Sequence, residues 1–125
     1  MKVLIEPSAD KKTKYTAYFF NSRGKYLKKT SFGALGYGDY PHYHRFHSAN
    51  VANKQKERYI ARHKPREDWH TDPTNRGLLS AWILWNKPTV KASIHDYAKQ
   101  FKLKLIPSED DLLKENSEKK RHYQI

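Results

Sequence analysis

Apolar and polar residues alternate near the start of the chain and again at residues 102–107, and this pattern predicts β-strands. Residues 1–7 (MKVLIEP) place Val3 and Ile5 on one side of an extended chain, and residues 14–20 (KYTAYFF) are dense in aromatic and β-favouring side chains. Residues 102–107 (KLKLIP) resemble the first strand in composition. They are expected to pair either with it or with the edge of a neighbouring hairpin.

A hairpin turn is predicted directly after the second strand. Residues 21–25 (NSRGK) supply Asn21 and Gly24, two residue types that tolerate positive φ. The following arm, residues 25–32 (KYLKKTSF), is basic and expected to face solvent. Residues 33–41 (GALGYGDYP) contain three of the five glycines and a proline, which indicates an irregular connection.

The pattern then changes to a helical period. Residues 54–64 (KQKERYIARHK) carry a narrow apolar seam on an otherwise charged helix, with Asn50 or Asn53 as the expected N-cap. Pro65 is expected to end this helix because proline lacks the backbone N–H that a helix interior requires.

Two further helices are predicted in the second half of the chain. Residues 72–86 are predicted to form a helix with Asp72 as N-cap and Pro73 at the first helical position. Residues 78–85 make this helix apolar almost all round, which indicates a central buried helix. Thr89 is the expected cap of a third helix, whose apolar positions over residues 90–101 recur at helical spacing. The outer face of the third helix is basic.

These elements predict an α+β fold, in which a small N-terminal antiparallel sheet or hairpin packs on about three helices, one of them central and apolar. The 125 residues suffice for one domain. We expect a single basic domain over residues 1–107. Residues 108–125 are expected to form a polar tail or a short helix, because Ser108 and Asp111 have the spacing of a capping box.

The charge balance favours polyanionic partners. The chain has 25 Lys and Arg against 13 Asp and Glu, a formal net charge of +12, and such a field attracts nucleic acid. The absence of Cys excludes the common structural zinc motifs and agrees with a reducing compartment. No apolar run reaches the roughly 18 residues of a membrane span, and no signal peptide is recognised, so we expect an intracellular protein without membrane contact.

The positive charge is concentrated in a few segments. The net charge is +6 over residues 1–32, zero over 33–50, +3 over 51–68 and +3 over 89–107. Basic side chains interleaved with tyrosines suit sequence-neutral contacts with phosphates. The side chains expected to bind nucleic-acid phosphates are Lys25, Lys28, Lys29, Arg45, Lys54, Arg58, Arg62 and Lys91.

Three histidines in residues 40–50 (YPHYHRFHSAN) raise the possibility of metal chemistry. They are His42, His44 and His47. The favoured interpretation is a polar, partly exposed loop whose positive charge increases as the pH falls through about 6.5.

Sharper interpretations of the same histidines need partners elsewhere in the chain. A nicking nuclease would use His42 and His44 to hold a metal ion and a helical tyrosine, Tyr59 or Tyr97, as nucleophile, but the Tyr-x-x-Lys spacing typical of such enzymes is missing. A zinc site would need a distant His63 or His70. Neither is adopted: the sequence assigns no catalytic residue, no metal ligand and no cofactor.

A series of motifs resembles an uncharacterised small basic domain family of large and giant double-stranded DNA viruses, the mimivirus and chlorovirus relatives. It covers about residues 14–103 and depends on the following residues: Phe32, Gly33, Gly36, Tyr37, Asp39, Tyr40, Arg58, Tyr59, Ile60, Arg62, His63, Trp69, Leu79, Ser80, Ile83, Leu84, Trp85, Lys87, Ala92, Ser93, Ile94, Asp96, Tyr97 and Phe101. The three clustered histidines depart from the family's pattern, in which that segment is Lys-rich with a single His. The resemblance implies a viral protein that acts in the infected cell, near viral DNA or inside the virion.

Two functions from different classes remain as hypotheses. In the first, the protein is a non-enzymatic binder of nucleic acid, expected to be DNA, through backbone contacts. In the second, it is a minor structural component of the capsid or core that acts through contacts with virion proteins. No small-molecule substrate is expected for either.

Overall fold

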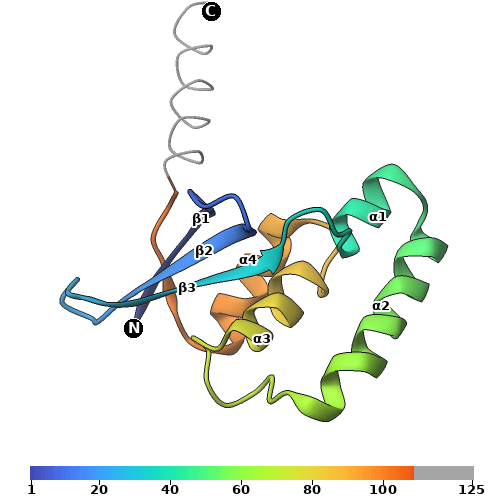
Figure 1. Ribbon diagram of the computed structural model, residues 1–125. Helices are drawn as coiled ribbons and strands as arrows, with labels where there is room; N and C mark the ends of the chain where they lie inside the picture. Colours follow the sequence, from blue (N-terminus) through green and yellow to red (C-terminus); the bar gives the residue numbers. More distant parts are fainter. Residues whose placement is uncertain (109–125) are drawn as a thin grey trace, which may run out of the picture.

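The protein folds into a four-stranded sheet with helices on one face (Figure 1). The structure is a computed structural model and describes residues 1–108. The strands are β1 (Lys2–Pro7), β2 (Thr13–Phe20), β3 (Tyr26–Ala34) and β4 (Lys104–Leu105). The helical elements are α1 (Tyr40–Phe46), α2 (Ala49–His63), the 3-10 turn η1 (Lys64–Arg66), α3 (Arg76–Leu79), the π turn η2 (Ser80–Leu84) and α4 (Val90–Gln100). The α+β class expected from the sequence is confirmed, while the expected tail at 108–125 lies almost wholly outside the described residues.

The strand order is β3-β2-β1-β4. The β1–β2 and β2–β3 pairs are antiparallel, and β4 pairs in parallel with β1, so that Lys2 faces Lys104. The sheet is therefore mixed, and the 102–107 segment pairs with the first strand, one of the two expected alternatives. The predicted hairpin turn is confirmed: Asn21 N donates to Lys25 O at 2.9 Å, and Gly24 has a φ of 85°.

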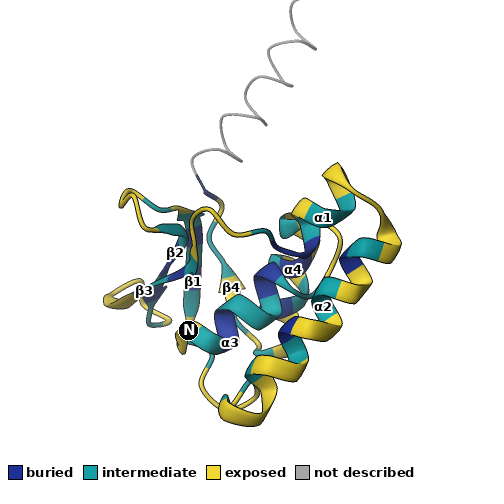
Figure 2. Cartoon of the chain, turned by 45° about the vertical axis from the view of Figure 1, so that its right-hand side comes forward, coloured by how far each residue is buried: buried dark blue, intermediate teal, exposed yellow. Residues whose placement is uncertain are grey.

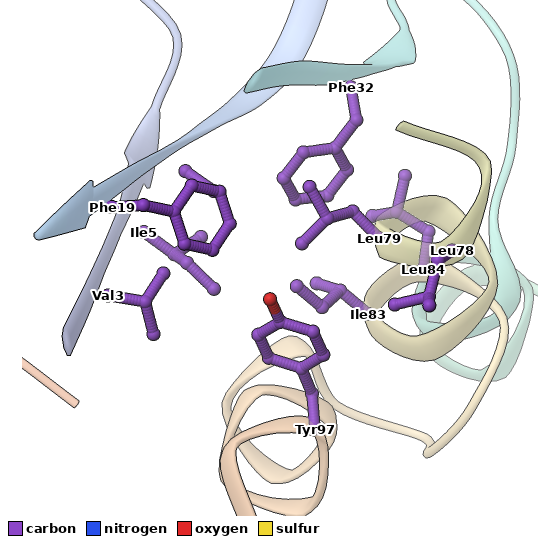
Figure 3. Packing of buried hydrophobic residues seen from close by; sticks show 10 residues of the cluster. Val3, Ile5, Phe19, Phe32, Leu78, Leu79, Ile83, Leu84 and Tyr97 are labelled. Atoms are coloured by element: carbon purple, nitrogen blue, oxygen red, sulfur yellow. The ribbon is translucent and has the colours of Figure 1, made fainter. Parts of the chain in front are cut away.

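One face of the sheet and two helical segments enclose the core (Figure 3). Alternation along β1 sends Val3 and Ile5 to the same face, as the sequence predicted, because successive side chains of a strand point to opposite sides. Phe19, which pairs with Val3, is buried on this face as well. The strand and helix residues of the core cluster are Val3, Ile5, Ala17, Phe19, Phe32, Leu78, Leu79, Ile83, Leu84 and Tyr97. The predicted central apolar helix is thus confirmed as buried, although its second half is a π turn.

The helix α2 lies beyond α3 on the side away from the sheet (Figures 1 and 2). Figure 2 shows that most of its outer surface is exposed, and it contributes only Ala52 and Tyr59 to the buried residues. No helix within residues 1–108 has the length and apolarity needed to cross a membrane.

Residues 40–46, expected as part of a polar loop, form the helix α1. Asp39 is its N-cap, because the carboxylate oxygen Oδ1 accepts a hydrogen bond from His42 N at 2.9 Å, and Pro41 lies in the first turn. Asp followed two residues later by Pro is a recognised start signal. The loop prediction was wrong because the glycines before this point dominated the interpretation of the segment.

Two other helices begin at residues different from those expected. Ser48, and neither Asn50 nor Asn53, caps α2 through a bond from Val51 N to Ser48 Oγ at 3.1 Å. Asn75 caps α3, whereas the predicted cap Asp72 accepts from Thr74 N in the preceding turn. In both cases several side chains of capping type lie within a few residues, and only the path of the backbone selects one of them.

The carboxylate of Asp96 links the helix α4 to the segment that precedes it. Asp96 Oδ2 accepts from Asn86 Nδ2 at 2.7 Å, and this bond, above all other causes, lowers the pKa of the Asp96 carboxyl. A carboxyl group whose folded pKa is depressed stabilises the fold above its ordinary pKa of 3.8, and that contribution is lost as the pH falls through the folded pKa.

We therefore expect the variant Asp96→Asn, which resembles the protonated carboxyl, to be less stable than the parent by about 1 kcal/mol at neutral pH. The difference in melting temperature should shrink towards zero below the ordinary Asp pKa. The matched control is Glu57→Gln, because Glu57 is exposed and has no hydrogen bond in the described structure. A difference for Asp96→Asn that is equally large at pH 7 and pH 3 would contradict the assignment.

Candidate nucleic-acid interface

The structure separates the eight side chains that the sequence assigned to phosphate binding. Lys25, Lys28 and Lys29 lie on the β2–β3 hairpin, at the end of the sheet far from α2 (Figure 1). Lys28 pairs with the buried Phe19 and Lys29 with Tyr18, so the two lysines point to opposite faces of the sheet. The hairpin cations therefore do not converge on one surface.

Three of the predicted cations do share a side of one helix. Lys54, Arg58 and Arg62 follow one another at intervals of four residues on α2, and all three are exposed. We call these three residues the α2 stripe. None of them makes an ion pair with another described residue.

The two remaining predicted cations stand apart from the α2 stripe. Arg45 lies on α1 with its guanidinium carbon 5.3 Å from the centre of the Phe46 ring. Lys91 is exposed in the first turn of α4. Both side chains are exposed, and neither lines the cleft beside α2 that is described next.

A cleft of about 790 Å³ opens beside the α2 stripe. Its walls come from α2, from the β3–α1 connection and from the start of α3, and we call it the α2–α3 cleft. Arg62 belongs both to the stripe and to this cleft, and Arg76 at the start of α3 also lines the cleft. Sequence reasoning missed Arg76, because it lies 14 residues further along the chain in a segment selected for its apolar content.

One wall of the cleft presents Tyr37, which was also missed as a functional candidate. The ammonium of Lys14 donates to the backbone carbonyl of Tyr37 at 2.6 Å and pairs with Asp39 Oδ2 at 2.7 Å. A Cβ added at Gly38 would lie 2.6 Å from the Tyr43 ring, so any larger residue there would displace this ring. Lys14 is thus an internal tie, and the Tyr37 side chain remains 76% exposed.

The opposite wall is organised around Glu67. His63 Nδ1–H donates to Glu67 Oε2 at 2.7 Å, and Trp69 Nε1–H donates to Glu67 Oε1 at 3.0 Å. A Cβ added at Gly77 would collide with the Glu67 carboxylate, so a larger residue there would displace Glu67 from this arrangement. Both oxygens of Glu67 are therefore committed to holding the wall of the cleft.

Stacked aromatic rings form the floor of the cleft. The Tyr59 ring lies parallel to Trp85, with centroids 4.6 Å apart, and stacks on the His63 ring at 4.4 Å. Burial, reinforced by the nearby Glu67 carboxylate, raises the pKa of the Tyr59 hydroxyl well above its ordinary value. Tyr59 thus stays protonated at neutral pH.

The second tyrosine considered as a nucleophile is enclosed in the core. The Tyr97 side chain is fully buried, and its hydroxyl donates to the backbone carbonyl of Pro73 at 2.6 Å. Burial also raises the pKa of this hydroxyl. The position of Tyr97 therefore gives no support to its use as a nucleophile.

The three clustered histidines lie along α1 and at its C-cap. The rings of His42 and His47 have centroids 6.0 Å apart, whereas His44 turns inward and meets the Tyr40 ring edge-on at 4.5 Å. His44 Nε2 is buried without a hydrogen-bond partner. Within residues 1–108, no three side chains of the metal-binding types come together.

Most carboxylates of the described domain accept hydrogen bonds from their own neighbourhood, and only Asp39 pairs with a Lys or Arg of that domain. Six of them accept hydrogen bonds from backbone amides or neutral and histidine side chains of their own neighbourhood: Asp10, Asp39, Glu67, Asp68, Asp72 and Asp96. In the described part of the chain, Lys14 is the one Lys or Arg in an ion pair. The remaining Lys and Arg side chains of that part make no ion pair, although Lys56 donates to the Asn86 carbonyl at 2.9 Å and lies 4.6 Å from the centre of the Tyr40 ring.

No family model, curated protein or solved structure matches the chain. The resemblance to viral domains therefore stays a prediction from the motifs.

Proposed function

We propose that the protein binds nucleic acid through sequence-neutral contacts between backbone phosphates and the α2 stripe. The observation that carries this proposal is that no Lys or Arg within residues 1–108 except Lys14 pairs with a carboxylate, in a chain of net charge +12. A cation already paired with a carboxylate gains little from a phosphate, whereas an unpaired cation releases condensed counterions from the nucleic acid when it binds.

The placement of the α2 stripe supports the same proposal. Its three side chains stand on one straight element, at the spacing of successive helical turns, which is about 5–6 Å. Consecutive phosphates along one nucleic-acid strand are separated by a comparable distance, so a helix with cations at this spacing can follow a backbone. No base-reading residue is needed, and the expected binding is sequence-neutral.

The proposed biological setting follows from the resemblance to domains of large and giant DNA viruses. The partner is then viral DNA, in the infected cell or in the virion. The alternative proposal is a minor capsid or core component, and it is supported by exposed apolar side chains near α1, namely Leu35 and Phe46, which are 47% and 65% exposed.

The proposal is tested by measuring DNA binding of the purified protein at about 50 mM and about 200 mM salt. We expect binding at the lower concentration and a loss of affinity of about 40-fold or more at the higher one, since three or more phosphate contacts give a log–log salt slope of about −2.7 or steeper. A protein that acts only through virion proteins would show no binding at about 50 mM salt. That result would overturn the proposal.

A further inference from the structure

Tyr37 presents an aromatic ring that residues 1–108 leave largely uncovered. Its side chain is 76% exposed, and it makes none of the ring contacts that most other tyrosines of this region make. The Lys14–Asp39 pair and the bond from Lys14 Nζ to the Tyr37 carbonyl fasten the backbone on which the ring stands. The ring is thus held at the cleft by a fixed loop while its faces stay open to a ligand.

The residues that line the α2–α3 cleft carry a positive net charge, because Lys14, Arg62 and Arg76 outnumber Asp39 and Glu67. Asp39 is neutralised by Lys14, whereas Glu67 keeps its negative charge while it accepts from His63 and Trp69. Arg62 comes from α2 and Arg76 from α3, and both are exposed and without an ion pair to a described residue. Arginine is well suited to phosphate, because its planar guanidinium donates two parallel hydrogen bonds.

The volume of the cleft fits one nucleotide. At about 790 Å³ it falls within the range of about 300–1,000 Å³ that is usual for small-ligand sites. A paired base inside a duplex is stacked on both sides and cannot reach an aromatic ring in a cleft. An unpaired base has two free faces and stacks readily on tyrosine.

We propose that the α2–α3 cleft binds one unpaired nucleotide of single-stranded nucleic acid. Arg62 and Arg76 contact its phosphate, and Tyr37 stacks on its base. The neighbouring phosphates of the same nucleic-acid strand then contact the other side chains of the α2 stripe along the helix. This inference rests on the proposed function and deepens it, because it names single strands as the preferred form of the ligand.

The experiment compares affinity for a fluorescently labelled oligothymidylate of about 20 nucleotides with affinity for a duplex of equal length, at the same salt concentration. The variant Tyr37→Ala should lower single-strand affinity about 5- to 10-fold, the low end of the cost of removing one base–aromatic stack, and leave duplex affinity within about twofold. The matched control is Tyr26→Ala, since Tyr26 is 51% exposed on the hairpin, outside the cleft. Both side chains are exposed, so unchanged melting temperatures verify that the variants fold.

A second variant separates the phosphate contact from the stacking contact. Arg76→Gln should also weaken single-strand binding more than duplex binding, whereas Arg66→Gln, an exposed arginine outside the cleft, should weaken both equally. Equal affinity for the two nucleic acids, with no effect of Tyr37→Ala on either, would overturn the inference while the proposed function stands. No binding to either nucleic acid would overturn both.

Discussion

Neutralising the α2 stripe is expected to reduce affinity for single-stranded DNA about 100-fold at roughly 0.15 M salt, since each lost phosphate contact forfeits about 1 kcal/mol of counterion-release free energy. The variant carries Lys54→Gln, Arg58→Gln and Arg62→Gln. Gln is a good helix former, and the three side chains are exposed, so α2 is expected to persist.

The control for this variant removes the same charge from a different surface. Lys25→Gln, Lys28→Gln and Lys29→Gln also lower the net charge by three, but Lys28 and Lys29 point to opposite faces of the sheet. This hairpin variant should weaken only the long-range electrostatic attraction, and its affinity for DNA should fall about tenfold or less.

Fluorescence anisotropy titrations over a range of salt concentrations provide the measurement. The α2 variant should also reduce the magnitude of the log–log salt slope by about two, since about 0.7 counterions are released per single-strand phosphate contact. If the two triple variants lost affinity to the same extent, binding would depend on overall charge alone, and the assignment of the site to α2 would be wrong.

Replacing Phe19 with alanine is expected to lower the free energy of unfolding by about 3–5 kcal/mol. Phe19 is 0% exposed on a central strand, where it belongs to the cluster that joins β1 and β2 to α3, η2 and α4 (Figure 3). The deletion removes a large apolar side chain from contact with both layers, and the surrounding side chains can close the resulting cavity only in part.

Phe46→Ala is the matched control, because Phe46 is 65% exposed at the end of α1. The Phe46→Ala substitution should change the free energy of unfolding by about 0.5 kcal/mol or less. Chemical denaturation of the parent and both variants measures the two free-energy differences. Equal costs for Phe19→Ala and Phe46→Ala would contradict the described core.

The sequence predicted those parts of the fold that depend on near neighbours in the chain. Alternation placed Val3 and Ile5 on the buried face of β1, and the cap at Thr89 and the seam of α4 are as expected. The pattern failed where several local signals compete within a few residues. Asp39 and Pro41 start a helix in a stretch whose glycines indicate a loop, and Asn75 caps α3 although Asp72 is nearby.

The sequence by itself also determined the charge, the separate basic segments and three cations at helical spacing on α2. Only the tertiary structure decided which of these charges share a surface. The cleft joins Lys14, Tyr37, Arg62 and Arg76, which come from four separate segments of the chain. A local sequence pattern depends on the environment of one helix or strand. Whether these four side chains line one cleft depends on how α2 and α3 pack relative to the sheet. The hairpin cations Lys28 and Lys29, although adjacent in the sequence, do not share a surface, because neighbouring positions of a strand point to opposite faces.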